Sequence, residues 1–224
     1  MKRKTIILLI SLAILLIGGG ITGWCLYKKH QENVYMEKVK NMTLNSCALE
    51  LFTDYFSSTL QLQFGLFAKY HQILNPMYKY GLLESYADSS YMNVSNIQSV
   101  YTTTYGYYVF DGTIKKIENL KNDITSIYSE IRDNAPKSLT SMRDDACSMY
   151  ESLCDYYGLL ENPGSYFSFN IEISSKKSKL NQKMEVLQTR FSISDEDAEN
   201  KLRGVIGEDM CIDFKKKMIA LINL

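Results

Sequence analysis

The feature that most constrains this chain is an uncharged, apolar stretch over residues 5–27, TIILLISLAILLIGGGITGWCLY. At about 1.5 Å per residue a helix of that length reaches roughly 34 Å, which is enough to cross a hydrocarbon core of about 30 Å. Three basic residues precede the stretch, whereas only Lys28 and Lys29 directly follow it. The pattern predicts a single-pass anchor in the cell membrane, with the N-terminus cytoplasmic and residues 30–224 extracytoplasmic.

A cleaved signal peptide is the alternative interpretation of the same stretch, with its apolar region over residues 5–17 and the three glycines at 18–20 as the cleavage site. The apolar run, however, continues past these glycines. Trp24 and Tyr27 also stand where aromatic side chains line a membrane interface. Both observations favour a retained anchor, so the lipid bilayer is the first partner that we expect.

The charge and length of the part that follows the anchor limit its partners and its domain organisation. All 25 acidic residues lie after residue 27, and five of the 25 basic residues flank the anchor. The exported part is therefore mildly acidic, and we expect no nucleic-acid partner. Only three prolines occur in the whole chain, which favours long helices. We expect two parts: an anchor over residues 1–29 and one helical bundle domain over residues 30–224.

Helical periodicity supports this architecture. Apolar residues keep helical spacing from about residue 32 to residue 74, where Asn75 and Pro76 should end the first long helix. Two further helices are predicted over residues 114–131 and 139–160, and the second keeps a three-and-four spacing typical of a bundle or coiled coil. The short break between them makes them antiparallel neighbours. The predicted fold class is all-α: an N-terminal transmembrane helix followed by an antiparallel helical bundle with long helices.

Two stretches leave the secondary structure open. Residues 100–110 are rich in β-branched and aromatic side chains, and residues 167–173 alternate apolar and polar, so each is compatible with a strand or a helix. The helical period resumes at Leu180. A last segment begins at Ser194, whose hydroxyl and the acidic residues after it are typical of a helix N-cap and first turn.

The stretch from about residue 114 to residue 191 resembles uncharacterised membrane-anchored helical proteins of Gram-positive bacteria. The resemblance rests on an isoleucine-lined helix over residues 114–131, a proline-started helix that ends in aromatic residues, and a turn at residues 162–165. It covers about a third of the chain and implies no known activity. It also implies that residues 167–173 are helical.

The cysteines and acidic residues predict no metal or cofactor site. Cys147 and Cys154 lie seven residues apart on one predicted helix, about 10.5 Å between their Cα atoms, so they should not bridge each other. Each could pair with Cys47 or Cys211, although small buried thiols are the simpler interpretation. The acidic run at residues 195–199 lacks the glycine and the glutamate of a calcium loop, so we interpret it as a helix start.

Tyrosines over residues 76–112 provide the candidate interaction surface: Tyr101, Tyr105 and Tyr108. Core packing is the alternative role for them. Because the chain contains no GxSxG or HExxH motif, we expect a non-enzymatic, membrane-anchored bundle that acts in protein–protein interaction or envelope scaffolding. The alternative function is an extracytoplasmic small-ligand binding or sensing domain, which requires a pocket between helices.

Overall fold

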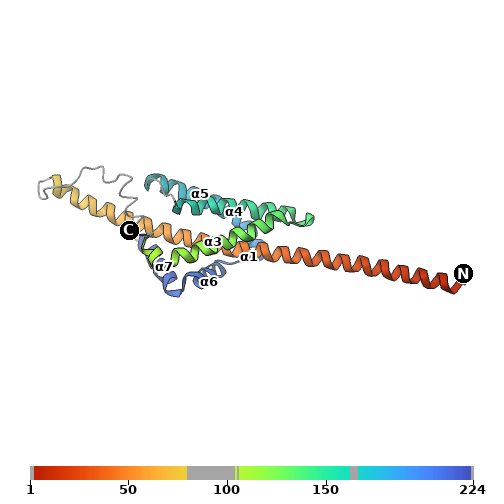
Figure 1. The fold of residues 1–224 in the computed structure, drawn as a ribbon. Coiled ribbons are helices and arrows are strands. Elements are labelled where there is room, and N and C mark those ends of the chain that lie inside the picture. The colour runs from red at the N-terminus through yellow and green to blue at the C-terminus, as the bar shows by residue number, and fades with distance from the viewer. Residues whose placement is uncertain (1–2, 80–103, 105, 162–165, 223–224) are drawn as a thin grey trace.

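The computed structural model describes the backbone of residues 3–79, 104, 106–161 and 166–222, and the side chains of these residues except 3–22, 64–79, 166–168, 170, 218 and 220–222. Every secondary-structure element in this part of the chain is helical, which confirms the all-α prediction. The longest helix, α1 (Arg3–Lys79), forms the axis of the molecule, and the other helices pack around its middle (Figure 1).

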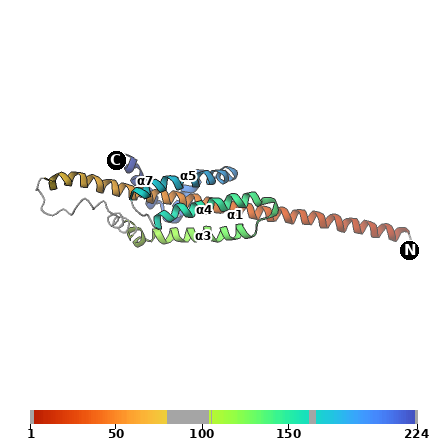
Figure 2. The same cartoon turned by 90° about the horizontal axis from the view of Figure 1, so that it is seen from above.

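α1 is helical along its whole length because no residue before Pro76 forbids it, but only its middle is buried. The core residues of α1 keep helical spacing from Tyr35 to Leu60, and they include all six that the sequence predicted in this span: Val39, Met42, Leu49, Phe52, Phe56 and Leu60. Toward the N-terminus the helix extends away from the bundle in both views (Figures 1 and 2). Side chains from Gly23 to Gln31 are accordingly exposed.

The predicted end of this helix at Asn75 and Pro76 is wrong by about one turn, because α1 continues to Lys79. Proline removes one backbone N–H and crowds the preceding turn, but this cost does not prevent residues 75–79 from being helical.

α3 (Thr113–Asp133) and α4 (Thr140–Glu161) confirm the two amphipathic helices that the periodicity predicted, with a short 3-10 turn, η2 (Lys137–Leu139), between them. The Tyr35 hydroxyl donates to the Ile131 carbonyl at 3.1 Å, while Ile114 lies near Phe52 and Phe56, so α3 runs antiparallel to α1. Ser138 and Tyr156 hydrogen-bond to Glu32 and Asp54, so α4 runs parallel to α1.

α5 (Tyr166–Phe191) resolves the strand-or-helix alternative for residues 167–173 in favour of the helix. The alternating pattern that suggested a strand arises because the helix is partly exposed: Phe169 and Ile173, four residues apart, are buried, whereas Ile171 is 56% exposed. Residues 104 and 106–110 are also helical. No partner strand is present among the described residues, and period-two patterning alone could not exclude a helix.

The C-terminal segment divides into α6 (Asp195–Ile206) and α7 (Glu208–Ile222). Ser194 caps α6 as predicted, since its hydroxyl accepts from the Asp197 N–H and the Asp197 carboxylate accepts from the Ser194 N–H. The sequence prediction did not include the break between the two helices. It falls at Gly207, whose φ of 100° is open to glycine and strained for other residues.

α7 closes the core against α1. The ring of Phe214 lies edge-on to Phe52 at 5.7 Å between centroids and stacks on Tyr55 at 5.9 Å. Phe214 is fully buried, and α6 packs beside it against α1 and α3. Phe52 and Tyr55 of α1 are therefore core residues.

The five cysteines are free thiols in this structure. Cys147 and Cys154 both lie on α4, as the periodicity predicted, and Cys47 and Cys211 are buried. Burial raises the pKa of the Cys47 thiol to about 12, so this sulfur is protonated and unreactive at neutral pH.

The predicted membrane anchor falls mostly outside the described side chains. The backbone of residues 5–27 belongs to α1, but side chains are described only from residue 23 onward. Among the described residues, none of the helices contains a stretch that is both long and apolar enough to cross a membrane.

Candidate functional site

Of the three candidate interaction tyrosines, the structure describes Tyr108, which is buried. Tyr101 and Tyr105 lie outside the described residues. Tyr108 is only 1% exposed: its ring packs against Phe56 and Phe214, and its hydroxyl accepts a hydrogen bond from Lys217 Nζ at 2.7 Å. The part of the prediction that rests on Tyr108 is therefore corrected, because the hydrophobic cost of exposing this ring placed it in the core.

The neighbours of Tyr108 are exposed instead. Residues 104 and 108, four apart on a helix, face inward, and the helical rotation therefore turns Tyr107 and Phe110 outward. Tyr107 is 60% exposed, Val109 49% and Phe110 94%. We call Tyr107, Val109 and Phe110 the 107–110 patch. A fully exposed phenylalanine beside two other exposed apolar residues is a feature of interaction surfaces.

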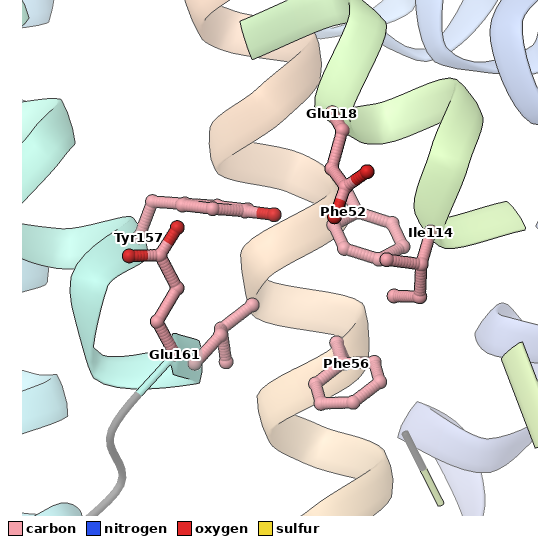
Figure 3. Close-up of a pocket in the computed structure, with 7 residues that line it drawn as sticks. Phe52, Phe56, Ile114, Glu118, Tyr157 and Glu161 are labelled. Atoms are coloured by element: carbon pink, nitrogen blue, oxygen red, sulfur yellow. The ribbon is translucent and has the colours of Figure 1, made fainter. Parts of the chain in front are cut away.

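A small hollow lies between α1, α3 and α4 (Figure 3). Phe52 and Phe56 of α1 lie between Ile114 and Glu118 of α3 on one side and Tyr157 and Glu161 of α4 on the other. Its volume is about 30 Å³, which leaves room for little more than a water molecule.

One of the two carboxylates that line this hollow, that of Glu161, is already paired. Lys121 Nζ pairs with Glu161 at 2.5 Å and lies 4.7 Å from the centre of the Tyr157 ring. A site of this volume offers little to a ligand. We interpret the hollow as a packing gap where three helices meet.

A larger and more polar groove lies between α1, α4 and α5. Its volume is about 200 Å³, and polar groups from all three helices line it: Asp54, Ser57, Ser58, Gln61, Tyr156, Ile173, Ser174 and Lys177. Serine hydroxyls and an amide donate and accept hydrogen bonds equally well. The groove therefore has the chemistry of a binding site for a small polar molecule.

Asp54 is the centre of the groove, and it receives one hydrogen bond from each of the two other helices. The buried Tyr156 hydroxyl of α4 donates to its Oδ1 at 2.5 Å, and Lys177 of α5 forms an ion pair with its Oδ2. The Asp54 side chain is 17% exposed, whereas that of Lys177 is 40% exposed. Burial, and next the Asp54 charge, raises the pKa of Tyr156, so its hydroxyl remains a donor.

Glu50 lies one helical turn before Asp54 on α1. Its pKa is raised to about 7, first by burial and then by the negative charge of Asp54, while Lys177 opposes the shift and Asp195 adds to it. A carboxylic acid that titrates near neutral pH is found at functional sites more often than elsewhere. Glu50 does not itself line the groove.

This site was not predicted from the sequence, because only the apolar face of α1 was considered. Beside that face, polar residues repeat with spacings of four, four, three and four: Ser46, Glu50, Asp54, Ser57 and Gln61. This is the spacing of one stripe along a helix. Polar residues in a stripe beside a buried apolar face, and not opposite it, were the available signal.

Ser57 differs from the buried threonines of α1, and it shares the lack of a hydrogen-bond partner with Ser46 of the same stripe. The hydroxyls of Thr43, Thr53 and Thr59 each donate to the carbonyl four residues earlier, at 2.8 to 2.9 Å. Ser57 is 4% exposed, and its Oγ has no hydrogen-bond partner in the structure. A buried hydroxyl without a partner is costly in a folded protein, so its position at the groove calls for a ligand group.

The acidic run in the first turns of α6 has structural roles. Asp197 caps the helix, and Glu199 accepts from both Arg203 and Lys215 at 2.6 Å. In the part of the chain that the structure describes, no group of three or more His, Cys, Asp or Glu side chains is arranged to hold a metal ion.

Comparison with known proteins adds no relative to this picture, since no family model, curated protein or solved structure matches the chain. Its function must therefore be argued from the geometry alone.

Proposed function

We propose that this chain is a non-enzymatic, membrane-tethered helical bundle that binds another protein, in an interaction or scaffolding role at the cell envelope. In this proposal residues 5–27 anchor it in the cell membrane, the N-terminus is cytoplasmic, and residues 30–224 are extracytoplasmic. The observation that carries the proposal is the continuity of α1, which runs from the proposed anchor into the centre of the bundle without a break.

An unbroken helix transmits position and orientation from the membrane to the bundle. Tyr35 is the first core residue of α1, eight residues after Tyr27, so the bundle begins about 12 Å beyond the proposed interface. Trp24 and Tyr27 are exposed, and their rings stack at 6.1 Å between centroids. Amphipathic aromatic rings followed by Lys28 and Lys29 suit the headgroup region of a bilayer.

The 107–110 patch is the surface that we assign to the protein partner. Phe110 and Tyr107 supply a large apolar contact area with few rotatable bonds, as residues at the centre of an interface do. Tethering both proteins to one membrane raises their effective concentration, so a small patch suffices for binding.

A photo-crosslinking experiment tests this assignment. A photoreactive phenylalanine analogue placed at position 110 of the full-length protein, in the membrane of the cell that makes it, should give a crosslinked protein band on irradiation. The matched control places the same analogue at Lys115, an exposed residue of α3 five positions away, and should give none. The assignment fails if position 110 gives no band, or if the two positions give the same bands.

A further inference from the structure

The groove between α1, α4 and α5 is independent of the 107–110 patch, and polar groups from all three helices line it. We propose that it binds a small, neutral molecule that carries several hydroxyl groups, such as a monosaccharide or a cyclic polyol. The proposal rests on the groups that line the groove and on the unpaired, buried hydroxyl of Ser57.

The charge of the lining favours a neutral ligand. Asp54 and Lys177 are the two lining residues with a formal charge, and they neutralise each other in an ion pair. A cation would have to displace Lys177 from Asp54, and an anion would have to draw Lys177 away from it. Either exchange loses an existing charge-assisted hydrogen bond, so a charged ligand gains little.

The remaining lining groups favour hydroxyls. Ser57, Ser58 and Ser174 each present one hydroxyl, and Gln61 presents an amide. A ligand hydroxyl can donate to one such group while it accepts from another, which satisfies both partners at a single position. Ser57 needs such a group most, since its Oγ is buried and has no partner in the protein.

The dimensions of the groove limit the size of the occupant. A volume of about 200 Å³ is below the roughly 300–1,000 Å³ of pockets that enclose drug-sized ligands. Ile173 adds an apolar side chain beside the serines, which suits the C–H face of a ring. A single sugar or polyol ring matches these limits, whereas a longer chain does not.

The test uses the full-length chain in detergent micelles and four named probes. Saturation-transfer NMR should detect binding of glucose or myo-inositol, and weak or no binding of choline. Inorganic phosphate, followed by the width of its phosphorus-31 resonance, should likewise show weak or no binding. Ser174→Tyr fills the groove from its exposed rim and should abolish the signal. Ser175→Tyr makes the same change at an exposed position that does not line the groove, and it should leave the signal unchanged.

Ser57→Ala provides a second, independent variant. Loss of one hydrogen bond should weaken binding of the sugar or polyol about five- to tenfold. The unfolding temperature of this variant should not fall, because the hydroxyl that it removes has no partner in the protein. Affinity unchanged by Ser57→Ala, or equal signals from Ser174→Tyr and Ser175→Tyr, would overturn the proposal. So would the absence of binding by glucose and myo-inositol at millimolar concentration, or tighter binding of choline or phosphate.

Discussion

Leu153→Asp is expected to lower the free energy of unfolding by roughly 3–5 kcal/mol. Leu153 lies on α4, is 1% exposed, and belongs to the core that α4 forms with α1, α3 and α5. The substitution removes a buried leucine and places a carboxylate without a partner in its position. Both effects act in the same direction, which makes this one of the largest effects that a single substitution can have.

Lys116→Asp is the matched control for this experiment. Lys116 lies on the polar face of the neighbouring helix α3 and is exposed, so the same new side chain should change stability by no more than about 0.5 kcal/mol. Chemical denaturation of the full-length protein in mild detergent, followed by circular dichroism, measures both variants. Similar effects of the two substitutions would mean that the core face of α4 has been misassigned.

Glu50→Gln is expected to remove a loss of stability that the raised pKa of Glu50 should cause in the native protein as the pH rises. The folded-state pKa of Glu50 is about 7, against an ordinary value of 4.5. Between these two values the folded protein holds a proton that the unfolded chain has released. The free energy of unfolding must therefore fall as the pH rises through this window, and it should level off above about pH 7.

The expected size of this effect follows from the shift. Relative to the native protein, Glu50→Gln should be more stable by roughly 2–3 kcal/mol at about pH 8, with the difference vanishing near pH 4. Denaturant unfolding across this range measures it. The pKa values of Asp197 and Glu199 are lowered, so the titration of these groups affects stability only at a pH below this window. Both groups are present in the native protein and in the variant. Glu151→Gln, at an exposed site on α4, should not alter the pH dependence. A pH dependence that persists in Glu50→Gln would show that another group causes it.

The apolar periodicity was sufficient to predict the main helices. Buried residues at three-and-four spacing place α3 and α4 almost residue by residue, because an amphipathic helix must turn one face to the core. The Ser194 cap was equally predictable from the sequence, because a serine hydroxyl followed by acidic residues satisfies the free N–H groups of a first turn.

The failures have a common physical cause, which is that tertiary contacts decide what a local pattern leaves open. Residues 167–173 alternate like a strand, but only two of their apolar side chains, Phe169 and Ile173, are described as buried, at the spacing of a helix. Tyr108 is core and Phe110 is surface because Phe214, more than 100 residues away, packs on the tyrosine. No local pattern contains that contact.

The groove could not be predicted from the sequence, for the same reason. Asp54, Tyr156 and Lys177 lie on three helices, and each is unremarkable in its own segment of sequence. The polar stripe on α1 was visible, but its partners on α4 and α5 follow only from the way that the helices pack. A functional site assembled between helices is therefore harder to predict than the helices themselves.

The central claim is that α1 links a membrane anchor to a bundle on the extracytoplasmic side, and cysteine labelling tests it directly. In a variant whose five native cysteines are replaced by alanine, one new cysteine is introduced at Glu151, exposed on α4, or at Lys4, before the anchor. A membrane-impermeant thiol reagent applied to intact cells, or to protoplasts where a wall blocks access, should label Glu151→Cys, and should label Lys4→Cys only after lysis. Labelling of Glu151→Cys only after lysis would contradict the account.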